Sequence, residues 1–502
     1  MARDERKLAR RLEAAKGGQR RRSEGPELSG KPRLEWSGRT RAMPYGGIGT
    51  LLELARDVGL TSKLDDELGV LKRPHPYTDA DHVLNIAFNI LCGGRVLDDI
   101  EVRRNDLVFL DALGARSIPD PTTAGDYCRR FGAEDVLQLM LILNDIRVEM
   151  WRRQGPEFLA ETARIDADGS LVPSSGECKQ GMDVTYKGQW GYHPLLVSLA
   201  NTQEPLFILN RSGNRPSYEH AAHLLDQSIA LARRAGFEDI LLRGDTDFSQ
   251  TEYLDGWDDD GVRFVFGYDA MKGLVNRADA LDDAEYRRLE RAADRVIEGK
   301  RARQPRVREQ IVRERGFKNL VLSHEDVAEF DYQPTKAAKS YRIIALRKTI
   351  DEERGQLCLD THIRYFFYIT NDREMSAEQV VREANGRCNQ ERLIEQLKSG
   401  VRALHAPLNT LNANWAYMVI ASVAWTLKAW FALRLPISPR WRDRHLAQRD
   451  RILRMEFRSF LQTLMWVPVQ IVHTGRRLIH RVLAWRPQLP ILFRLHAALD
   501  TS

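Results

Sequence analysis

The pattern of hydrophobic and polar positions divides the chain into a helical beginning, a mixed centre and a helical end. Between residues 47 and 150, apolar residues recur at the three- and four-residue spacing of helices, and glycines mark several helix ends. From residue 159 the stretch LAETARIDADGSLVP alternates instead, and the short apolar runs that follow it predict further strands. One helical pattern, ending near Gly236, lies among these strands. The centre is therefore predicted to be a mixed α/β sheet.

This order is interrupted between residues 272 and 360. A heavily charged stretch at 281–316 comes first, and three strand-like segments, AEFDYQP, YRIIALRK and RYFFYITND, follow it. We expect an inserted, largely β subdomain with a basic excursion. A long helix is predicted at 376–402, and helices punctuated by prolines are predicted from there to the end.

The most apolar helical pattern, WAYMVIASVAWTLKAWFAL at 415–433, has the length of a membrane span. Lys428 interrupts it and Arg434 follows it directly. We therefore expect a buried core helix and no membrane association.

Composition excludes a wholly disordered or fibrous chain, because 43% of the 502 residues are hydrophobic and 29% are charged. The net charge of +6 is unevenly distributed: residues 1–42 sum to +7, residues 438–502 to +8 and the remainder to −9. Basic ends favour a polyanionic partner such as nucleic acid. Solvated helix faces explain the same charge equally well.

The five cysteines, none of which forms a CxxC pair, predict no disulfide framework and fit a reducing cytoplasm. The charged N-terminal sequence does not have the pattern of a secretory signal.

Carboxylates at predicted strand ends are the first candidates for chemistry. Asp166 and Asp168 share one face of the strand in RIDADGS, because side chains alternate along a strand. In LLRGDTDFS, a buried strand delivers Asp245 and Asp247 just past its end. Two neighbouring strand ends would bring carboxylates together, and Mg²⁺ prefers such oxygen ligands. Ordinary turn chemistry is the alternative for either motif alone.

A third candidate lies in the predicted helix ANGRCNQERLIEQLKSG at 384–400. Its polar stripe consists of Arg387, Glu391, Glu395 and Lys398. Leu393 and Leu397 supply an opposite, buried face, so the stripe could line a cleft. A solvated face with ion pairs between successive turns is the alternative.

In this order the motifs resemble those of DDE transposases of bacterial insertion sequences, in particular the insertion-sequence thirteen-eighty family (transposase DDE domain group 1). The resemblance runs from about residue 45 to residue 490. RIDADGS is similar to the first-strand motif and selects Asp168 over Asp166, while LLRGDTDF resembles RGDSGF and selects Asp245. RCNQERLIEQLK matches R-x3-E-x6-K; the residues it selects are Arg387, Glu391 and Lys398.

Two positions depart from the family pattern. Ala384 stands where the motif has Tyr, and Asp247 stands where it has Gly. The three carboxylates are intact.

The resemblance implies an α/β fold with a ribonuclease H-like mixed sheet core, a β-rich insertion between the second Asp and the Glu, and α-helical regions at both ends. The 146-residue separation of Asp245 and Glu391 leaves room for that insertion. The domains expected are a basic mobile arm at 1–42, a helical DNA-binding or support domain at 43–158, the two parts of the catalytic core at 159–271 and 363–435, the insertion at 272–362 and a basic C-terminal helical region at 436–502.

The resemblance also implies the chemistry. Two Mg²⁺ ions, for which Mn²⁺ substitutes, would support phosphoryl transfer. Asp168 would hold both ions, Asp245 one and Glu391 the other. Arg387 and Lys398 would hold phosphates. Trp190 or Trp257 could stack on a flipped base, although packing is the expected role of both.

The function implied is that of a transposase in the bacterial cytoplasm, associated with the nucleoid. It would bind double-stranded DNA as a homodimer, cleave at the terminal inverted repeats and join the 3′-OH ends to target DNA. A catalytically impaired or domesticated DNA-binding copy, and a ribonuclease H-like nuclease without strand transfer, are the alternatives.

Overall fold

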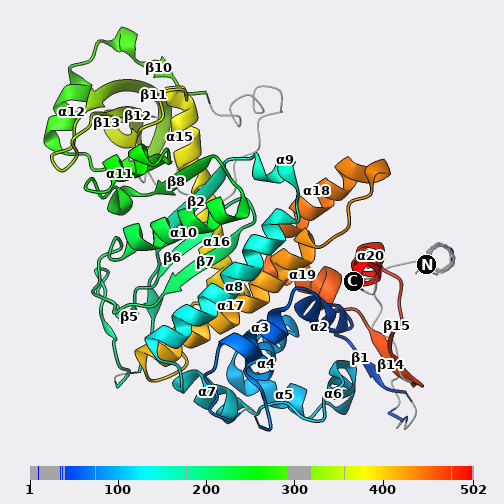
Figure 1. Ribbon diagram of the computed structural model, residues 1–502. Coiled ribbons are helices and arrows are strands. Elements are labelled where there is room, and N and C mark those ends of the chain that lie inside the picture. The colour runs from blue at the N-terminus through cyan, green and yellow to red at the C-terminus, as the bar shows by residue number, and fades with distance from the viewer. Residues whose placement is uncertain are drawn as a thin grey trace.

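A computed structural model describes most of the chain, and Figure 1 shows how its elements are arranged. The described residues are 40–73, 75–176, 178–290, 318–354, 357–475 and 477–499, together with Arg10, Leu34, Glu35 and Ser37. The predicted arm at 1–42, apart from its last few residues, and most of the basic excursion lie outside the described residues.

The centre of the protein is a nine-stranded mixed sheet with the order β10-β11-β12-β13-β9-β8-β2-β6-β7. Neighbours pair antiparallel except for β2 with β8 and β8 with β9, which are parallel. This confirms an α/β protein with a large mixed sheet. The strands are β2 Ala163–Gly169, β6 Leu195–Leu199, β7 Glu204–Leu209, β8 Ile240–Gly244, β9 Arg263–Tyr268, β10 Arg287–Arg288, β11 Lys318–Tyr332, β12 Tyr341–Arg354 and β13 Leu357–Thr370.

The predicted insertion is not a separate β unit, because its strands extend the central sheet. β13 pairs antiparallel with β9 over four residues, from Phe367 opposite Tyr268 to Thr370 opposite Val265. Beyond this short contact the three long strands pair with one another and reach away from the rest of the sheet (Figure 1). The alternating pattern predicted these strands, but it carries no information about which neighbour each one joins.

Helices make up the region before the sheet, as the apolar spacing predicts. The helix α4 begins at a capping box in which Thr78 and Asp81 satisfy each other's backbone N–H groups. The helices in this region are α2 Gly47–Asp57, α3 Leu60–Glu67, α4 Asp79–Leu91, α5 Ile100–Arg104, α6 Leu107–Leu113, α7 Pro121–Arg129, α8 Ala133–Arg152 and α9 Pro156–Leu159.

Helices cover both faces of the sheet. Leu242 of β8 points into the main core, which α10 (Ala221–Ala235) also enters, whereas Leu241 packs with Val380 and Val381 of α15 (Ala377–Gly386) on the opposite face. The remaining helices are α11 Leu254–Asp259, α12 Lys272–Asp279, α16 Cys388–Glu395, α17 Leu411–Leu433, α18 Arg442–Leu453, α19 Phe457–Phe460 and α20 Leu489–Leu499.

The apolar helix α17 is the centre of the helical layer. By length and composition it could cross a membrane, but its most apolar window is entirely buried within the protein. It runs alongside α8 in Figure 1 and contacts α2, α4, α7 and β7 as well. Even Lys428 is buried there, and its ammonium donates a hydrogen bond to the Leu453 carbonyl at 2.8 Å. The prediction of a buried core helix is correct.

The C-terminal region is not helical throughout, so that part of the prediction is wrong. A hairpin of β14 (Val469–Thr474) and β15 (Arg477–Val482) follows α19, and β1 (Ala42–Met43) pairs with β14. β15 is largely exposed, whereas β14 buries Val469 and Ile471, and the third strand of this small sheet comes from the other end of the described chain. Its short alternation therefore gives little signal in the sequence.

A buried carboxylate ties the sheet to the two long helices. Glu204, the first residue of β7, accepts hydrogen bonds at 2.9 Å from the indoles of Trp151 on α8 and Trp430 on α17. The Arg147 guanidinium lies 3.4 Å from the same carboxylate, and both charged side chains are fully buried. Burial lowers the pKa of Arg147 to about 10, although Glu204 acts to raise it.

We expect Glu204→Ala to reduce the free energy of unfolding by about 3–5 kcal/mol, because it leaves the buried Arg147 without its counter-charge. Urea unfolding of the whole protein measures this. Glu149→Ala is the control, since Glu149 forms an exposed pair with Arg152 on α8 and such pairs contribute about 0–1 kcal/mol. Equal losses in the two variants would show that the buried pair does not hold the layers together.

Candidate active site

Three carboxylates from three elements meet at one edge of the sheet. Asp168 lies near the end of β2, and Asp245 directly follows β8. These strands are parallel neighbours, with Asp166 opposite Arg243, so their carboxyl ends deliver both side chains to the same place. Glu391 is in the first turn of α16, which packs against β2.

The guanidinium of Arg387 joins the three. Its Nη1 lies 3.4 Å from Asp168 Oδ2 and 3.9 Å from Asp245 Oδ2, while its Nη2 lies 3.6 Å from Glu391 Oε1. Because Asp168 Oδ2 and Asp245 Oδ2 both lie within 4 Å of the same nitrogen, these two carboxylates must also lie close to each other. The residues that the sequence selected as a triad are brought together around a fourth residue that it also selected.

The electrostatics of this group reflect crowding of like charge. Burial, together with the negative charges of Asp245 and Glu391, raises the pKa of Asp168 to about 7 against the opposing influence of Arg387. Burial also raises the pKa of Asp245, again against the influence of Arg387. One arginine thus only partly neutralises three carboxylates.

The predicted helix at 376–402 is broken, and the break decides which polar residues reach the site. α15 ends at Gly386, Arg387 is a turn residue, and α16 begins at Cys388. A π-helical turn at Gln396–Gly400 then shifts the phase of the helix. The single stripe predicted for this segment is therefore wrong.

Glu395 and Lys398, the two later members of the predicted stripe, lie in different surroundings. Glu395 turns to its own neighbours, accepting hydrogen bonds from Gln396 at 2.5 Å and from Ser399. Lys398 remains near the site: burial lowers its pKa, whereas the nearby Asp168 raises it.

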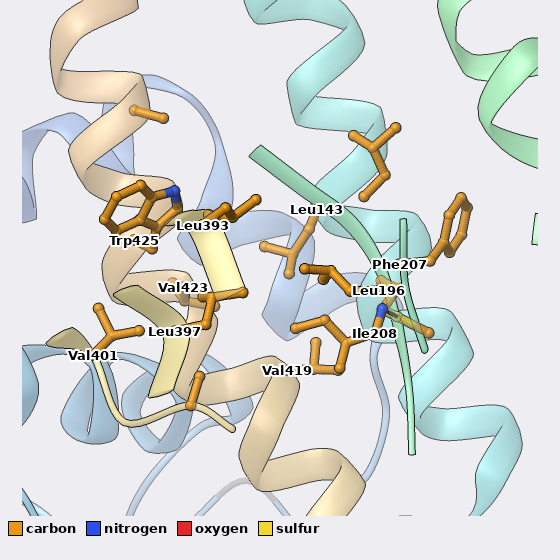
Figure 2. Packing of buried hydrophobic residues seen from close by; sticks show 14 of the residues in the cluster. Leu143, Leu196, Phe207, Ile208, Leu393, Leu397, Val401, Val419, Val423 and Trp425 are labelled. Atoms are coloured by element: carbon orange, nitrogen blue, oxygen red, sulfur yellow. Dashed lines mark hydrogen bonds between the residues drawn. The ribbon is translucent and has the colours of Figure 1, made fainter. Parts of the chain in front are cut away.

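Apolar contacts and one polar side chain hold α16 in place. Leu393 and Leu397 are buried as predicted, and Figure 2 shows them beside Trp425 and Val423 of α17. On the sheet side, the Gln390 amide donates to the Leu196 carbonyl of β6 at 3.3 Å. Both contacts keep Glu391 turned toward the strand ends.

The sequence missed the partner of Asp166. That carboxylate is fully buried and accepts two hydrogen bonds from Arg243 of β8, at 2.7 and 2.9 Å. Arg243 is the Arg of the RGD sequence that ends at Asp245. Its position in that motif was the signal in the sequence that Arg243 lies near the site. Asp166 therefore shares a strand face with Asp168 but is already committed to an ion pair.

The two candidate stacking residues differ in environment. Trp257 is buried and its indole donates to Asp226 at 2.8 Å, so it packs as expected. Trp190 of β5 (Trp190–Tyr192) is 58% exposed, and the expectation of packing is wrong for it. β5 is the middle strand of a small sheet with β3 (Val172–Pro173) and β4 (Asp183–Val184).

The donor set fits a divalent cation, although the side chains are not arranged to chelate one as they lie. Three carboxylates supply the hard oxygen ligands that Mg²⁺ prefers, and they already surround a cation, the Arg387 guanidinium. Among the described residues, no group of three or more His, Cys, Asp or Glu side chains is close enough to hold a metal ion. Arg387 lies within 4 Å of all three carboxylates, which are the residues that would hold a divalent cation.

The raised pKa of Asp168 predicts a pH-dependent stability in metal-free buffer. The folded state binds the proton more tightly than the unfolded state, so stability is lost as pH rises from about 4 to 7. Relative to Asp168→Asn, the wild type should lose at most about 4 kcal/mol of unfolding free energy over this range. Urea unfolding with EDTA at several pH values measures it, and added Mg²⁺ should reduce the loss. Asp66→Asn, on the exposed face of α3, is the control; a pH-independent difference would contradict the crowding of charge.

Comparisons with known proteins identify the family of this chain. The family description that matches is transposase DDE domain group 1, over residues 34–501. A search of curated proteins finds no match. Among solved structures, the chain is similar to a piggyBac transposase in a synaptic complex with hairpin DNA, determined by cryo-EM, with 10% identity, a TM-score of 0.37, and coverage of 84% of this chain and 80% of that one. Because the family match spans most of the sequence, this chain belongs to the transposase DDE domain group 1 family.

Proposed function

We propose that this transposase binds the terminal inverted repeats of its own element, cleaves the DNA there and joins the freed 3′-OH ends to target DNA. The observation that carries the proposal is the meeting of Asp168, Asp245 and Glu391 around one guanidinium in a chain of this family. We also propose that this chain is a member of the insertion-sequence thirteen-eighty family of bacterial transposases.

The family generally uses divalent metal ions, and we propose two Mg²⁺ ions for this chain, with Mn²⁺ as a substitute. When bound, such ions stabilise the attacking and leaving oxygens of an in-line phosphoryl transfer. Asp168, Asp245 and Glu391 would hold them. We propose that both ions share Asp168, because its strand β2 contacts both β8 and α16.

Arg387 and Lys398 would then act on the DNA. With the carboxylates engaged in metal binding, the Arg387 guanidinium would be free to turn toward a phosphate. Its planar guanidinium suits two phosphate oxygens at once, whereas Lys398 provides a compact charge beside it. Both residues would orient the scissile phosphate.

We also propose that the core is ribonuclease H-like. In support, five strands in the order β7-β6-β2-β8-β9 place the two carboxylate strands side by side, and α10 connects the antiparallel part to the parallel part. β11, β12 and β13 lie in the interval between Asp245 and Glu391, where an insertion is expected. The predicted domain boundaries belong to this proposal.

The remaining roles follow from charge and from the family. We propose that the helical region at 43–158 reads base sequence, that the basic segments contact phosphates, and that two copies act together on double-stranded DNA in the cytoplasm, on the nucleoid.

A cleavage and joining assay with labelled repeat-end duplex and a target plasmid tests the whole proposal. Cleavage without joining would indicate a nuclease, and binding without cleavage an impaired copy.

Asp168→Ala, Asp245→Ala and Glu391→Gln should each reduce strand cleavage by about a thousandfold or more, because several kcal/mol of charge stabilisation is lost. Binding to the repeat duplex should stay within about twofold of wild type, since the proposed phosphate contacts come from basic side chains and not from the three carboxylates. Nicking of an end-labelled duplex with Mg²⁺ measures the first effect, and gel shift the second. Glu395→Gln, on the same helix but hydrogen-bonded away from the site, is the control. Normal cleavage by any of the three variants would remove that residue from the site.

Deletion of residues 1–42 should weaken binding to any duplex and flatten the slope of log affinity against log salt concentration. Each lost phosphate contact changes that slope by about 0.9. Preference for the repeat over a scrambled duplex should persist, because base contacts rather than phosphate contacts specify sequence. Competition titrations at several salt concentrations measure both. Loss of preference with an unchanged slope would show that the arm reads sequence.

A further inference from the structure

A charged cluster lies directly behind the three carboxylates and belongs to none of the roles assigned above. We call it the Arg243 cluster; its members are Arg164 and Asp166 of β2, Arg243 of β8 and Glu383 of α15. Arg164, Asp166 and Asp168 alternate along β2, so the cluster and the site occupy the same face of the strand.

Arg243 is the hub of this cluster. Its Nε and Nη2 donate to the two oxygens of Asp166 at 2.7 and 2.9 Å, and its Nη1 donates to Glu383 Oε2 at 3.0 Å. The same Nη1 also donates to the Glu383 backbone carbonyl at 3.3 Å. Arg164 holds the other side of Glu383, with Nη2 to Oε1 at 2.8 Å and Nε to Oε2 at 3.0 Å.

The centre of the cluster is buried, and its charges are balanced. The side chains of Arg243 and Asp166 are 3% and 1% exposed, whereas those of Glu383 and Arg164 are 21% and 34% exposed. Two cations face two anions, which is the condition under which such charges are tolerated inside a protein. Two-pronged arginine–carboxylate pairs also fix direction as well as distance.

Each member is close in sequence to a carboxylate of the site. Asp166 precedes Asp168 by two residues and Arg243 precedes Asp245 by two, so both lie on the strands that carry the site. Glu383 lies on the helix that leads into Arg387 and Glu391. The cluster therefore cross-links the two strands that carry Asp168 and Asp245 to α15, the helix that directly precedes Arg387 and α16.

The end of α15 is shaped for this contact. A Cβ built on Gly386 would lie 2.8 Å from Arg243 Nη1, so a larger residue there would press on the guanidinium. Apolar contacts of Val380 and Val381 with Leu241 also hold the helix on the sheet. Such contacts are not directional, so they leave the helix able to slide, whereas the ion pairs fix its register.

We infer that Glu383 is a positioning residue of the carboxylate site: through Arg243 and Arg164 it sets the approach of the segment that carries Arg387 and Glu391 toward Asp168 and Asp245. This inference rests on the proposed function, because it assumes that the three carboxylates share metal ions. The Glu383 carboxylate pairs with Arg164 and Arg243, so it would act on the site through them.

Glu383→Gln tests the inference because it keeps the shape of the side chain and removes its charge. We expect the Mn²⁺ affinity of the DNA-free protein, measured by electron paramagnetic resonance titration, to fall by about tenfold or more, as for other residues that orient metal ligands. Cleavage of the repeat duplex should fall at low Mn²⁺ and recover in part at high Mn²⁺, while duplex affinity stays unchanged. If Glu383 had a purely structural role, Glu383→Gln would lower the melting temperature without changing the Mn²⁺ affinity or the Mn²⁺ concentration that cleavage requires.

Two further variants make the test decisive. Glu378→Gln changes a carboxylate on the same helix that accepts a hydrogen bond from Ser376 in its own N-terminal turn, and it should match wild type in all three measurements. Gly386→Ala presses on Arg243 and should reproduce the effect of Glu383→Gln even if that variant folds poorly.

The outcomes separate the two proposals. If wild type binds Mn²⁺ and cleaves, and Glu383→Gln and Gly386→Ala bind Mn²⁺ equally tightly, the inference is wrong and the proposed function stands. If wild type neither binds Mn²⁺ nor cleaves the repeat duplex, the proposed function fails and the inference fails with it.

Discussion

Mutual repulsion of three carboxylates is the constraint on which the rest of the structure depends. Asp168, Asp245 and Glu391 lie together at one edge of the sheet, and burial together with the charges of Asp245 and Glu391 raises the pKa of Asp168 to about 7 against the opposing influence of Arg387. Arg387 contributes one positive charge against three negative ones. A second source of positive charge is therefore favoured at this point, and divalent ions provide it most simply.

The scaffold opposes that repulsion with directional contacts. Parallel pairing of β2 and β8 fixes two of the carboxylates, and the buried pair of Asp166 with Arg243 crosses between the same two strands. The third carboxylate lies on α16, where Leu393 and the following Leu397 pack against α17, while Glu383 ties the preceding helix α15 to the strands. Separate elements thus hold a geometry that their charges disfavour.

Much of the site was predictable because its signals are local. Asp168 and Asp245 follow recognisable strand patterns, and the spacing of Arg387, Glu391 and Lys398 matches a family motif. The mixed sheet and the buried α17 were also predictable, since alternation and long apolar runs reflect burial directly.

Other features depend on partners distant in sequence. The extension of the sheet by β13 requires β9, nearly 90 residues away, and the β14 hairpin pairs with β1 from the opposite end of the described chain. The helix break at Arg387 and the π-helical turn after Glu395 follow from packing, because the helical spacing of the sequence continues through both. Similarly, Asp166 could be told from Asp168 only by a motif, since its buried partner Arg243 is on another strand.

The position of bound metal ions tests the central claim most directly. Crystals of the protein grown with Mn²⁺, examined by anomalous scattering, would locate the ions without reference to activity. The account predicts anomalous peaks among the carboxylate oxygens of Asp168, Asp245 and Glu391, with the Arg387 guanidinium displaced from between them. Ordered carboxylates with Arg387 still among them and no peak nearby, at Mn²⁺ concentrations that support cleavage, would contradict it.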